Sequence, residues 1–140
     1  MTVALVGIPS NDAALAWCLV DEWIAKACEE NPAELEADEI RDACKDGGMQ
    51  LWLAWDAQAQ EPLACMVTSL QKGRDASLFA KIHILTGRQI DRWASLIDEF
   101  KRVSKDHGIS RIVALARPGY RRVFKTTGAE LRHIELVWEL

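Results

Sequence analysis

The spacing of apolar residues changes along the chain, and each change marks an expected secondary-structure element. Residues 3–8 form a short apolar run that Pro9 stops, which predicts a strand. Residues 12–29 carry apolar side chains at helical spacing, with good N-capping residues at their start, and this predicts an amphipathic helix. Pro32 marks the start of a second helix, which the glycine pair at Gly47 ends.

The next segments alternate apolar and other residues with the period of a strand. Residues 49–55, 63–70 and 76–85 read as strands, and polar turns separate them, so the sequence predicts a β-meander. Trp52 and Trp55 lie three residues apart in the first of these segments and are therefore expected on opposite faces of the sheet.

The last third of the chain predicts helix, strand, helix and strand. Residues 89–107 are expected to form a long helix, and residues 109–116 are apolar on both faces, as in a central strand. Residues 120–127 predict a short helix, and alternation over residues 133–140 predicts a terminal strand. Together these elements predict one α+β domain over residues 1–140. It would have α/β/α layers and a mixed, mostly antiparallel sheet of about six strands with about four helices, in the order β-α-α-β-β-β-α-β-α-β.

Composition and charge narrow the possible function classes. The chain has 140 residues, of which 49% are hydrophobic and 27% charged, and its formal net charge is −4. This negative balance argues against general binding of nucleic acid, which needs clustered lysine and arginine. No apolar run reaches the roughly 20 residues of a membrane-spanning helix, and the first residues lack the positive start of a signal peptide. We therefore expect a cytoplasmic protein without a membrane partner.

The four cysteines predict neither a metal site nor a disulfide framework. Cys18, Cys28, Cys44 and Cys65 form no C-x-x-C pair, and no histidine stands near them in the sequence at the spacing of a zinc knuckle. Their neighbours are apolar, so free and buried thiols in a reducing compartment are expected.

Two short motifs accompany the predicted element order. Gly87 follows the third strand of the meander, and RPGY at residues 117–120 precedes FKTTGAE at residues 124–130. With these residues the chain resembles the GNAT superfamily of acyl-CoA-dependent N-acetyltransferases, and more narrowly the short GNAT-like proteins of phages and prophages. The resemblance implies that acetyl-CoA binds where the fourth and fifth strands separate. It also implies that an amine attacks the thioester directly while backbone N–H groups stabilise the oxyanion.

The resemblance places the pyrophosphate of acetyl-CoA on the loop before the third helix, where backbone N–H groups bind anions. The cofactor-binding residues that it implies in this chain are Leu85, Gly87, Arg88, Gln89 and Arg92. The loop departs from the family pattern, because Thr86, Gln89 and Asp91 occupy its three defining positions and none of them matches. Asp91 also adds a negative charge beside the expected phosphates, which Arg88 and Arg92 offset in part.

Two residues are candidates for proton transfer. Where the family often has a tyrosine that protonates the leaving thiolate, this chain has Phe124, and its only tyrosine, Tyr120, lies one helical turn earlier. The fourth strand contains no acid but contains His83, and histidine titrates near neutral pH, as a general base should. A purely structural role stays open for both residues, with Tyr120 at the start of a helix and His83 at the edge of the core.

Three functions remain open at this point. The first is an N-acetyltransferase that acts on a small amine or a protein amino group, for which the acidic run of residues 29–39 with Asp42 would attract a cationic acceptor. The second is a GNAT-like domain without catalysis that binds a phage structural protein or a second copy of itself, in the host cytoplasm or in the virion. The third is an unrelated α+β domain that shares the element order.

Overall fold

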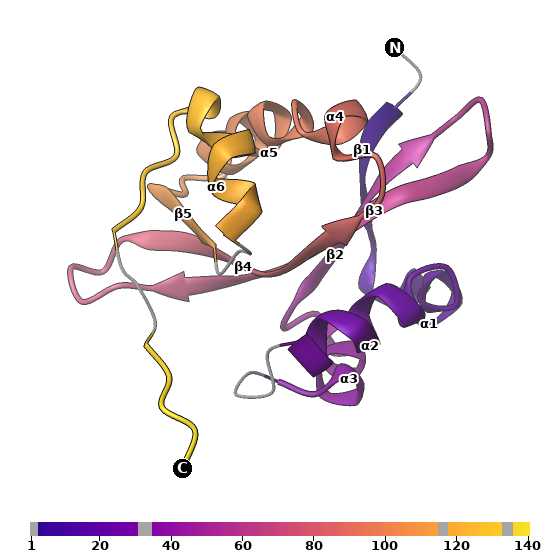
Figure 1. Ribbon diagram of the computed structural model, residues 1–140, viewed down its shortest axis with the longest axis horizontal. Coiled ribbons are helices and arrows are strands. Elements are labelled where there is room, and N and C mark those ends of the chain that lie inside the picture. Colours follow the sequence, from indigo (N-terminus) through magenta and orange to yellow (C-terminus); the bar gives the residue numbers. More distant parts are fainter. Residues whose placement is uncertain (1–2, 31–34, 115–117, 133–135) are drawn as a thin grey trace.

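The computed structural model describes residues 3–30, 35–114, 118–132 and 136–140. Its centre is a sheet of five strands in the order β1-β2-β3-β4-β5 (Figure 1). These strands are β1 (Val3–Ile8), β2 (Gln50–Asp56), β3 (Glu61–Lys72), β4 (Leu78–Gly87) and β5 (Arg111–Ala114). Neighbouring strands run antiparallel except β4 and β5, which are parallel. The predicted mixed sheet and its meander are therefore confirmed.

Helices cover both faces of this sheet, as the predicted α/β/α layers require (Figure 1). One face carries a 3-10 turn η1 (Ser10–Asp12), α1 (Ala13–Trp17), α2 (Asp21–Glu30) and α3 (Ala37–Asp46). The other face carries α4 (Ile90–Trp93), α5 (Leu96–Asp106), α6 (Pro118–Phe124) and a 3-10 turn η2 (Lys125–Thr127). Trp52 packs with the second group and Trp55 with the first, so their predicted placement on opposite faces is correct.

Packing interrupts the helix predicted over residues 12–29. The chain turns at residues 18–20 between α1 and α2, and this turn aims Trp17, Val20 and Ile24 at the sheet. The predicted apolar stripe is partly wrong, because Leu15 is 81% exposed and Leu19 is 47% exposed. Burial of one large aromatic side chain outweighs the regular helical spacing of two leucines here.

Two further helix boundaries differ from the prediction. The helix expected over residues 89–107 is divided into α4 and α5, with a turn at residues 94–95. α3 begins at Ala37, where Glu36 and Glu39 form a capping box, and the predicted start at Pro32 lies outside the described residues.

The carboxyl-terminal part of the sheet departs most from the prediction. β5 pairs only with β4 among the described strands, whereas its apolar sequence predicts a central strand; residues 115 and 116 of the predicted strand lie outside the described residues. The predicted terminal strand is wrong for residues 136–140, which have no regular structure, and residues 133–135 lie outside the described part of the chain. The sheet therefore has five described strands and not about six.

Candidate functional site

The described pairing of β4 with its parallel partner β5 covers the first half of β4. The parallel pairing runs from Phe79 opposite Arg111 to Ile82 opposite Ala114. β4 then continues to Gly87, and no described strand pairs with this second half on the β5 side. Residues 115–117, which follow β5, lie outside the described part of the chain, and the described pairing ends one residue before His83.

His83 is an extra residue in the pairing of β4 with β3. Val67 pairs with Ile84 and the next residue, Thr68, pairs with Ile82, so His83 forms a β-bulge. Bulges redirect a side chain and are over-represented beside active sites. The candidate base predicted from the sequence therefore occupies an irregular position of the strand.

A short hydrogen-bonded chain fixes the His83 ring. Ser69 Oγ lies 2.7 Å from His83 Nε2, and the side-chain amide of Gln71 donates to the same Ser69 oxygen at 3.2 Å. Ser69 is only 7% exposed. On β3 it follows Cys65 and Val67 at the two-residue period of a strand, and both face the core under α1–α3. A hydroxyl can donate to neutral Nε2 and accept from protonated Nε2, so this contact suits both charge states of the imidazole.

Ser69 and Gln71 were not identified as site residues from the sequence. Nothing in the local pattern of β3 distinguishes them, because their role depends on the register of β3 against a bulged β4. A bulge that places a histidine opposite a serine is decided by pairing between strands.

Tyr120 lies in a different environment from His83. Its ring packs edge-to-face against Trp93 of α4, with centroids 6.4 Å apart, and against Phe124, with centroids 5.9 Å apart. These rings belong to the cluster under α4 and α6. The predicted proximity of Tyr120 and Phe124 on one helical face is correct, and the described contacts give Tyr120 a packing role.

The loop predicted to bind the cofactor begins at a tightly packed glycine. A Cβ on Gly87 would lie 2.5 Å from the Cα of Ala64 on β3, so only glycine fits at this point. The next residue, Arg88, donates its backbone N–H to the Leu63 carbonyl at 2.8 Å. Gly87 is therefore required by the contact between β4 and β3 themselves.

The charged residues of this loop are engaged with carboxylates of the β2–β3 hairpin. The Arg88 guanidinium pairs with Glu61, and Arg92 Nη2 lies 2.9 Å from Asp56 Oδ2. Arg92 also donates to the side chain of Gln89 at 3.0 Å. Both arginines therefore reach toward β2 and β3, on the side of β4 opposite to β5.

Both carboxylate oxygens of Asp56 accept hydrogen bonds. Its Oδ1 accepts the backbone N–H groups of Ala59 at 3.2 Å and Gln58 at 3.0 Å, while Oδ2 accepts from Arg92. The backbone N–H of Ala59 and the Arg92 side chain hold the pKa of Asp56 below its ordinary value of 3.8. Asp56 thus ties the hairpin turn to α4.

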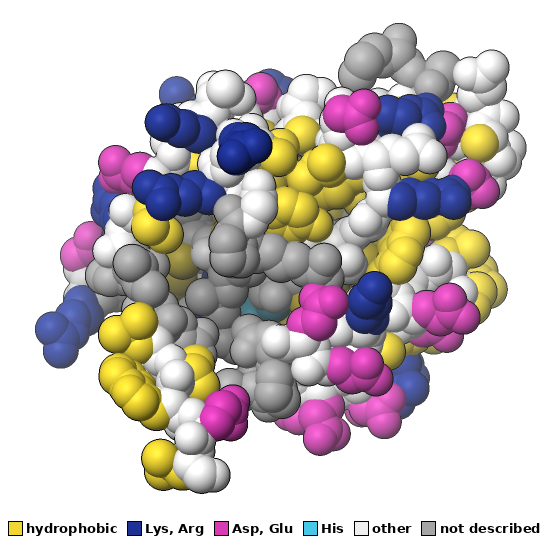
Figure 2. All heavy atoms as spheres, viewed as in Figure 1, with side chains coloured by type: hydrophobic (Ala, Val, Ile, Leu, Met, Phe, Trp, Pro, Cys, Tyr) yellow, Lys and Arg dark blue, Asp and Glu magenta, His cyan; other side chains and the backbone are white. Residues whose placement is uncertain are grey.

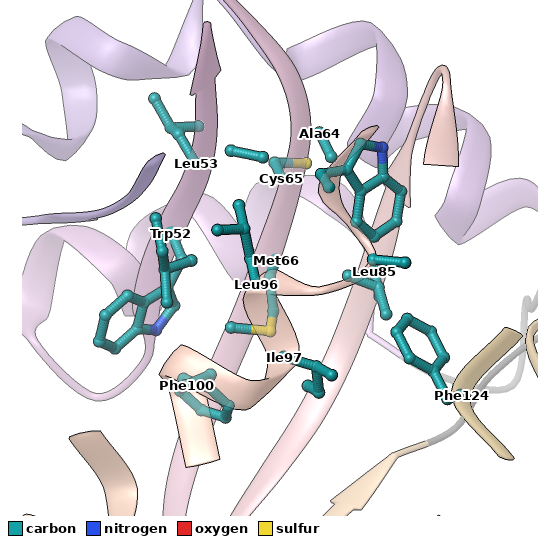
Figure 3. Close-up of a pocket in the computed structure, with 14 residues that line it drawn as sticks. Trp52, Leu53, Ala64, Cys65, Met66, Leu85, Leu96, Ile97, Phe100 and Phe124 are labelled. Atoms are coloured by element: carbon teal, nitrogen blue, oxygen red, sulfur yellow. The ribbon is translucent and has the colours of Figure 1, made fainter. Parts of the chain in front are cut away.

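Leu85, the fifth predicted cofactor residue, faces a small apolar cavity under α4–α6 (Figure 3). Trp52 lies beside Phe100 at one side of this cavity, and Leu85 lies beside Phe124 at the other. Its volume is about 30 Å³, comparable with one or two water molecules, and every lining side chain is apolar or Cys65. It is a packing gap rather than a space for a cofactor arm.

Neither a metal site nor a membrane span occurs in the part of the chain that the structure describes. No group of three or more metal-ligating side chains gathers among these residues. None of their helices combines the length and the apolar character that crossing a bilayer requires.

Solved acetyltransferase structures are similar to this chain over almost its whole length. An aminoglycoside acetyltransferase from an uncultured soil metagenomic sample, solved with sisomicin, has a TM-score of 0.69 at 12% identity, and the match covers 99% of this chain and 97% of that one. A ribosomal-protein-alanine N-acetyltransferase from Brucella melitensis biovar Abortus 2308 has a TM-score of 0.69 at 12% identity, with 99% and 100% covered. A probable acetyltransferase has a TM-score of 0.70 at 10% identity, with 98% and 96% covered. The fold is that of the GNAT acetyltransferases.

This likeness concerns the fold, because the sequence identities are low. No protein-family model and no curated protein sequence matches the chain. These three structures give no support to a phage origin. The expected GNAT-like α+β fold is confirmed.

Proposed function

We propose that this chain is a GNAT-type acyltransferase that moves an acetyl group from acetyl-CoA to an amine, with His83 as general base. One observation carries the proposal: His83 forms a β-bulge in β4, and Ser69 Oγ lies 2.7 Å from its Nε2. A bulged histidine whose ring is held by a hydrogen-bond chain is suited to acid–base chemistry.

His83 Nε2 takes up the proton that the amine loses, with the Ser69 hydroxyl as the bridging group. Ser69 passes its proton to Nε2 as it receives one from the amine, and the Gln71 amide keeps the Ser69 oxygen in place throughout. Acetyl-CoA would supply the activated thioester carbonyl: as the C–N bond forms, its C–S bond would break, and the departing CoA thiolate would take up the proton that His83 had received. Tyr120 is the second proton-transfer candidate, and its packing against Trp93 and Phe124 makes it the weaker of the two.

The acceptor in this proposal is a cationic amine, either a small molecule or a protein amino group. Asp and Glu side chains gather over α2 and α3, on the sheet face to which Ser69 belongs (Figure 2). Their negative field would concentrate a positively charged acceptor near the site. Two of the similar structures act on such groups according to their names, an aminoglycoside in one and a ribosomal-protein alanine in the other.

The two ends of acetyl-CoA fit this chain unequally. The resemblance to the GNAT acetyltransferases places the thioester end between β4 and β5, and His83 follows the last described pair of these two strands. The loop suits the phosphates less well, because Arg88 and Arg92 are paired with Glu61 and Asp56. Leu85, Gly87, Arg88, Gln89 and Arg92 remain the proposed cofactor-binding residues, on the condition that the arginines exchange a carboxylate for a phosphate.

The deciding experiment measures release of free CoA from acetyl-CoA with a panel of acceptors: an aminoglycoside, a polyamine and a peptide with a free amino terminus. We expect His83→Gln to lower kcat by about 100-fold or more, because general-base catalysis typically contributes that much. Ser69→Ala should lower kcat with little change in the KM of the amine, since its hydroxyl bridges the proton. His107→Gln is the matched control, because His107 is exposed at the end of α5 and contacts only its own helix in the described bonds.

Turnover that is unchanged in His83→Gln would overturn the assignment of the base. Absence of turnover with every acceptor, together with no stabilisation by acetyl-CoA, would favour a second function. That function is a GNAT-like domain without catalysis that acts through protein contacts, with a phage structural protein or with its own copies. This second function is favoured by the ion pairs of Arg88 with Glu61 and of Arg92 with Asp56, which neutralise the two arginines of the loop.

A further inference from the structure

Lys81 is a half-buried lysine within the sheet. It lies on β4, which runs between β3 and β5 (Figure 1), and its partners across these strands are Ser69 and Val113. Its chain neighbours Ala80 and Ile82 pack toward α5. Because side chains alternate along a strand, Lys81 leaves the sheet on the opposite face. This is also the face of Ser69, since residues that pair across two strands share a face.

The Lys81 ammonium has no partner in the described part of the chain. None of the ion pairs formed by these residues includes Lys81, and its side chain takes part in none of their hydrogen bonds. Asp75, in the turn between β3 and β4, accepts instead from the backbone N–H and the hydroxyl of Ser77. A cation that is partly removed from water is stabilised by an anion, which a ligand can supply here.

The position of Lys81 relative to the hydrogen-bonded chain of His83 indicates where on the ligand this anion lies. Ser69 Oγ is 2.7 Å from His83 Nε2 and is the group that receives the amine proton in the proposed reaction. Lys81 is directly opposite Ser69, so the Cβ atoms of the two residues are about 5 Å apart. An amine bound at the Ser69 hydroxyl therefore has a positive charge close to its own carbon skeleton.

We propose that the acceptor is an amino acid and that Lys81 binds its carboxylate while its amine lies at Ser69. This inference rests on the proposed function and narrows its acceptor from any cationic amine to one that carries a carboxylate beside the amine. The amine nitrogen bonds to the acetyl carbon as the C–S bond of acetyl-CoA breaks. The amine proton passes through Ser69 to His83 and then to the CoA thiolate, and Lys81 stays protonated throughout. A polyamine would meet repulsion from Lys81 instead.

The test compares acceptors that differ only in the carboxylate. The wild type is given acetyl-CoA with alanine, leucine, methionine or phenylalanine, or with the amide of each, and released CoA is measured. The amide keeps the amine and removes the negative charge. We expect the acid of at least one pair to have a kcat/KM about 10-fold or more above that of its amide, and above that of putrescine.

Three variants assign this preference to Lys81. Lys81→Met should raise the KM of the acid by about 10- to 100-fold with a smaller change in kcat, because a hydrogen bond between charged groups contributes that much, and should leave the amide unaffected. Lys81→Glu should favour the amide and putrescine, a reversal that a purely structural role would not produce. Lys72→Met is the matched control, because Lys72 is exposed at the end of β3, on the other face of the sheet.

The outcomes separate this inference from the proposed function. Turnover with equal kcat/KM for acids and amides, or a preference for the acid that Lys81→Met retains, overturns the role of Lys81 and leaves the acetyltransferase intact. Thermal-shift titration with the N-acetylated amino acids tests the same contact without turnover. If no acceptor reacts, stabilisation by these products that Lys81→Met abolishes supports the carboxylate site alone, and no stabilisation of the wild type overturns the site as well.

Discussion

A close contact with the β3 backbone explains why residue 87 is a glycine. We predict that Gly87→Ala lowers the free energy of unfolding by about 1–3 kcal/mol, because its Cβ would press on the β3 backbone, which cannot move aside easily. The contacts are the Leu63 carbonyl oxygen and the Cα of Ala64, the latter at 2.5 Å. The measurement is urea-induced unfolding of the variant and the wild type, followed by circular dichroism.

Gly119→Ala is the matched control for this substitution. Gly119 lies in α6, and a Cβ there would meet no atom within 4 Å. Alanine also favours helix over glycine, so this variant should be as stable as the wild type or slightly more stable. Equal losses in both variants would contradict the role given to the β3 contact. It also follows that a Gly87 substitution cannot test cofactor binding, since it disturbs the sheet first.

The four cysteines differ in exposure, which corrects the expectation that all are buried. Cys18 is exposed and Cys28 half-buried, whereas Cys44 and Cys65 are buried. Burial raises the pKa of the Cys65 thiol to about 12 and that of Cys44 to about 11. Because the thiolate is the reactive form, these two should resist modification.

We predict that a thiol reagent at pH 8 modifies Cys18 within seconds in the native protein. Cys28 should react more slowly, because burial raises its pKa too. Cys44 and Cys65 should react only at the rate of unfolding. Mass spectrometry of digested samples identifies each modified site, and denaturant should make all four react alike. Rapid labelling of Cys65 in the native state would contradict its place in the core.

Among the elements, the link between the β2–β3 hairpin and α4 depends on one carboxylate. Asp56 has a pKa below 3.8, so it stabilises the fold above that pH and loses this contribution as the pH falls through its folded value. We predict that Asp56→Asn lowers the melting temperature at pH 7 and makes stability less dependent on pH below about 4.

Thermal unfolding of the wild type and of Asp56→Asn between pH 2 and pH 7 measures this difference. Asp91→Asn, which changes an exposed carboxylate on the same helix as Arg92, serves as the control and should follow the wild-type profile. If Asp56→Asn keeps the full acid dependence of the wild type, other carboxylates dominate the acid unfolding of this fold.

For the whole molecule, binding of acetyl-CoA should appear as a global gain in stability. Ligand at about 100 times its Kd adds about 2.7 kcal/mol to the free energy of unfolding. Glu61 competes for Arg88 in the free protein, so Glu61→Gln should bind acetyl-CoA several-fold more tightly than the wild type. Thermal-shift titration measures both, with Glu99→Gln on α5 as a charge-matched control.

If Glu61→Gln binds acetyl-CoA with the same affinity as the wild type, Arg88 is not part of the phosphate site. If millimolar acetyl-CoA does not raise the melting temperature of the wild type, the protein does not bind acetyl-CoA.

The sequence by itself determined the elements whose signal is local. The meander of β2–β4 follows from alternation, and α3 ends at Gly47 in the left-handed conformation. The element order, together with Gly87 and the motifs within residues 117–130, carried the resemblance to the GNAT fold. These features depend on neighbours close along the chain, where periodicity and special residues are readable.

Only the tertiary structure decided the features that depend on strands meeting across the sheet. Pairing of β3 with β4 creates the bulge at His83 and brings Ser69 to it, and neither is encoded in the pattern of one strand. The same applies to β5, whose apolar sequence predicted a central strand but which forms an edge among the described strands. Residues 136–140 carry the sequence of a strand but pair with no described strand, because alternation along one segment does not supply the neighbouring strand that a sheet requires.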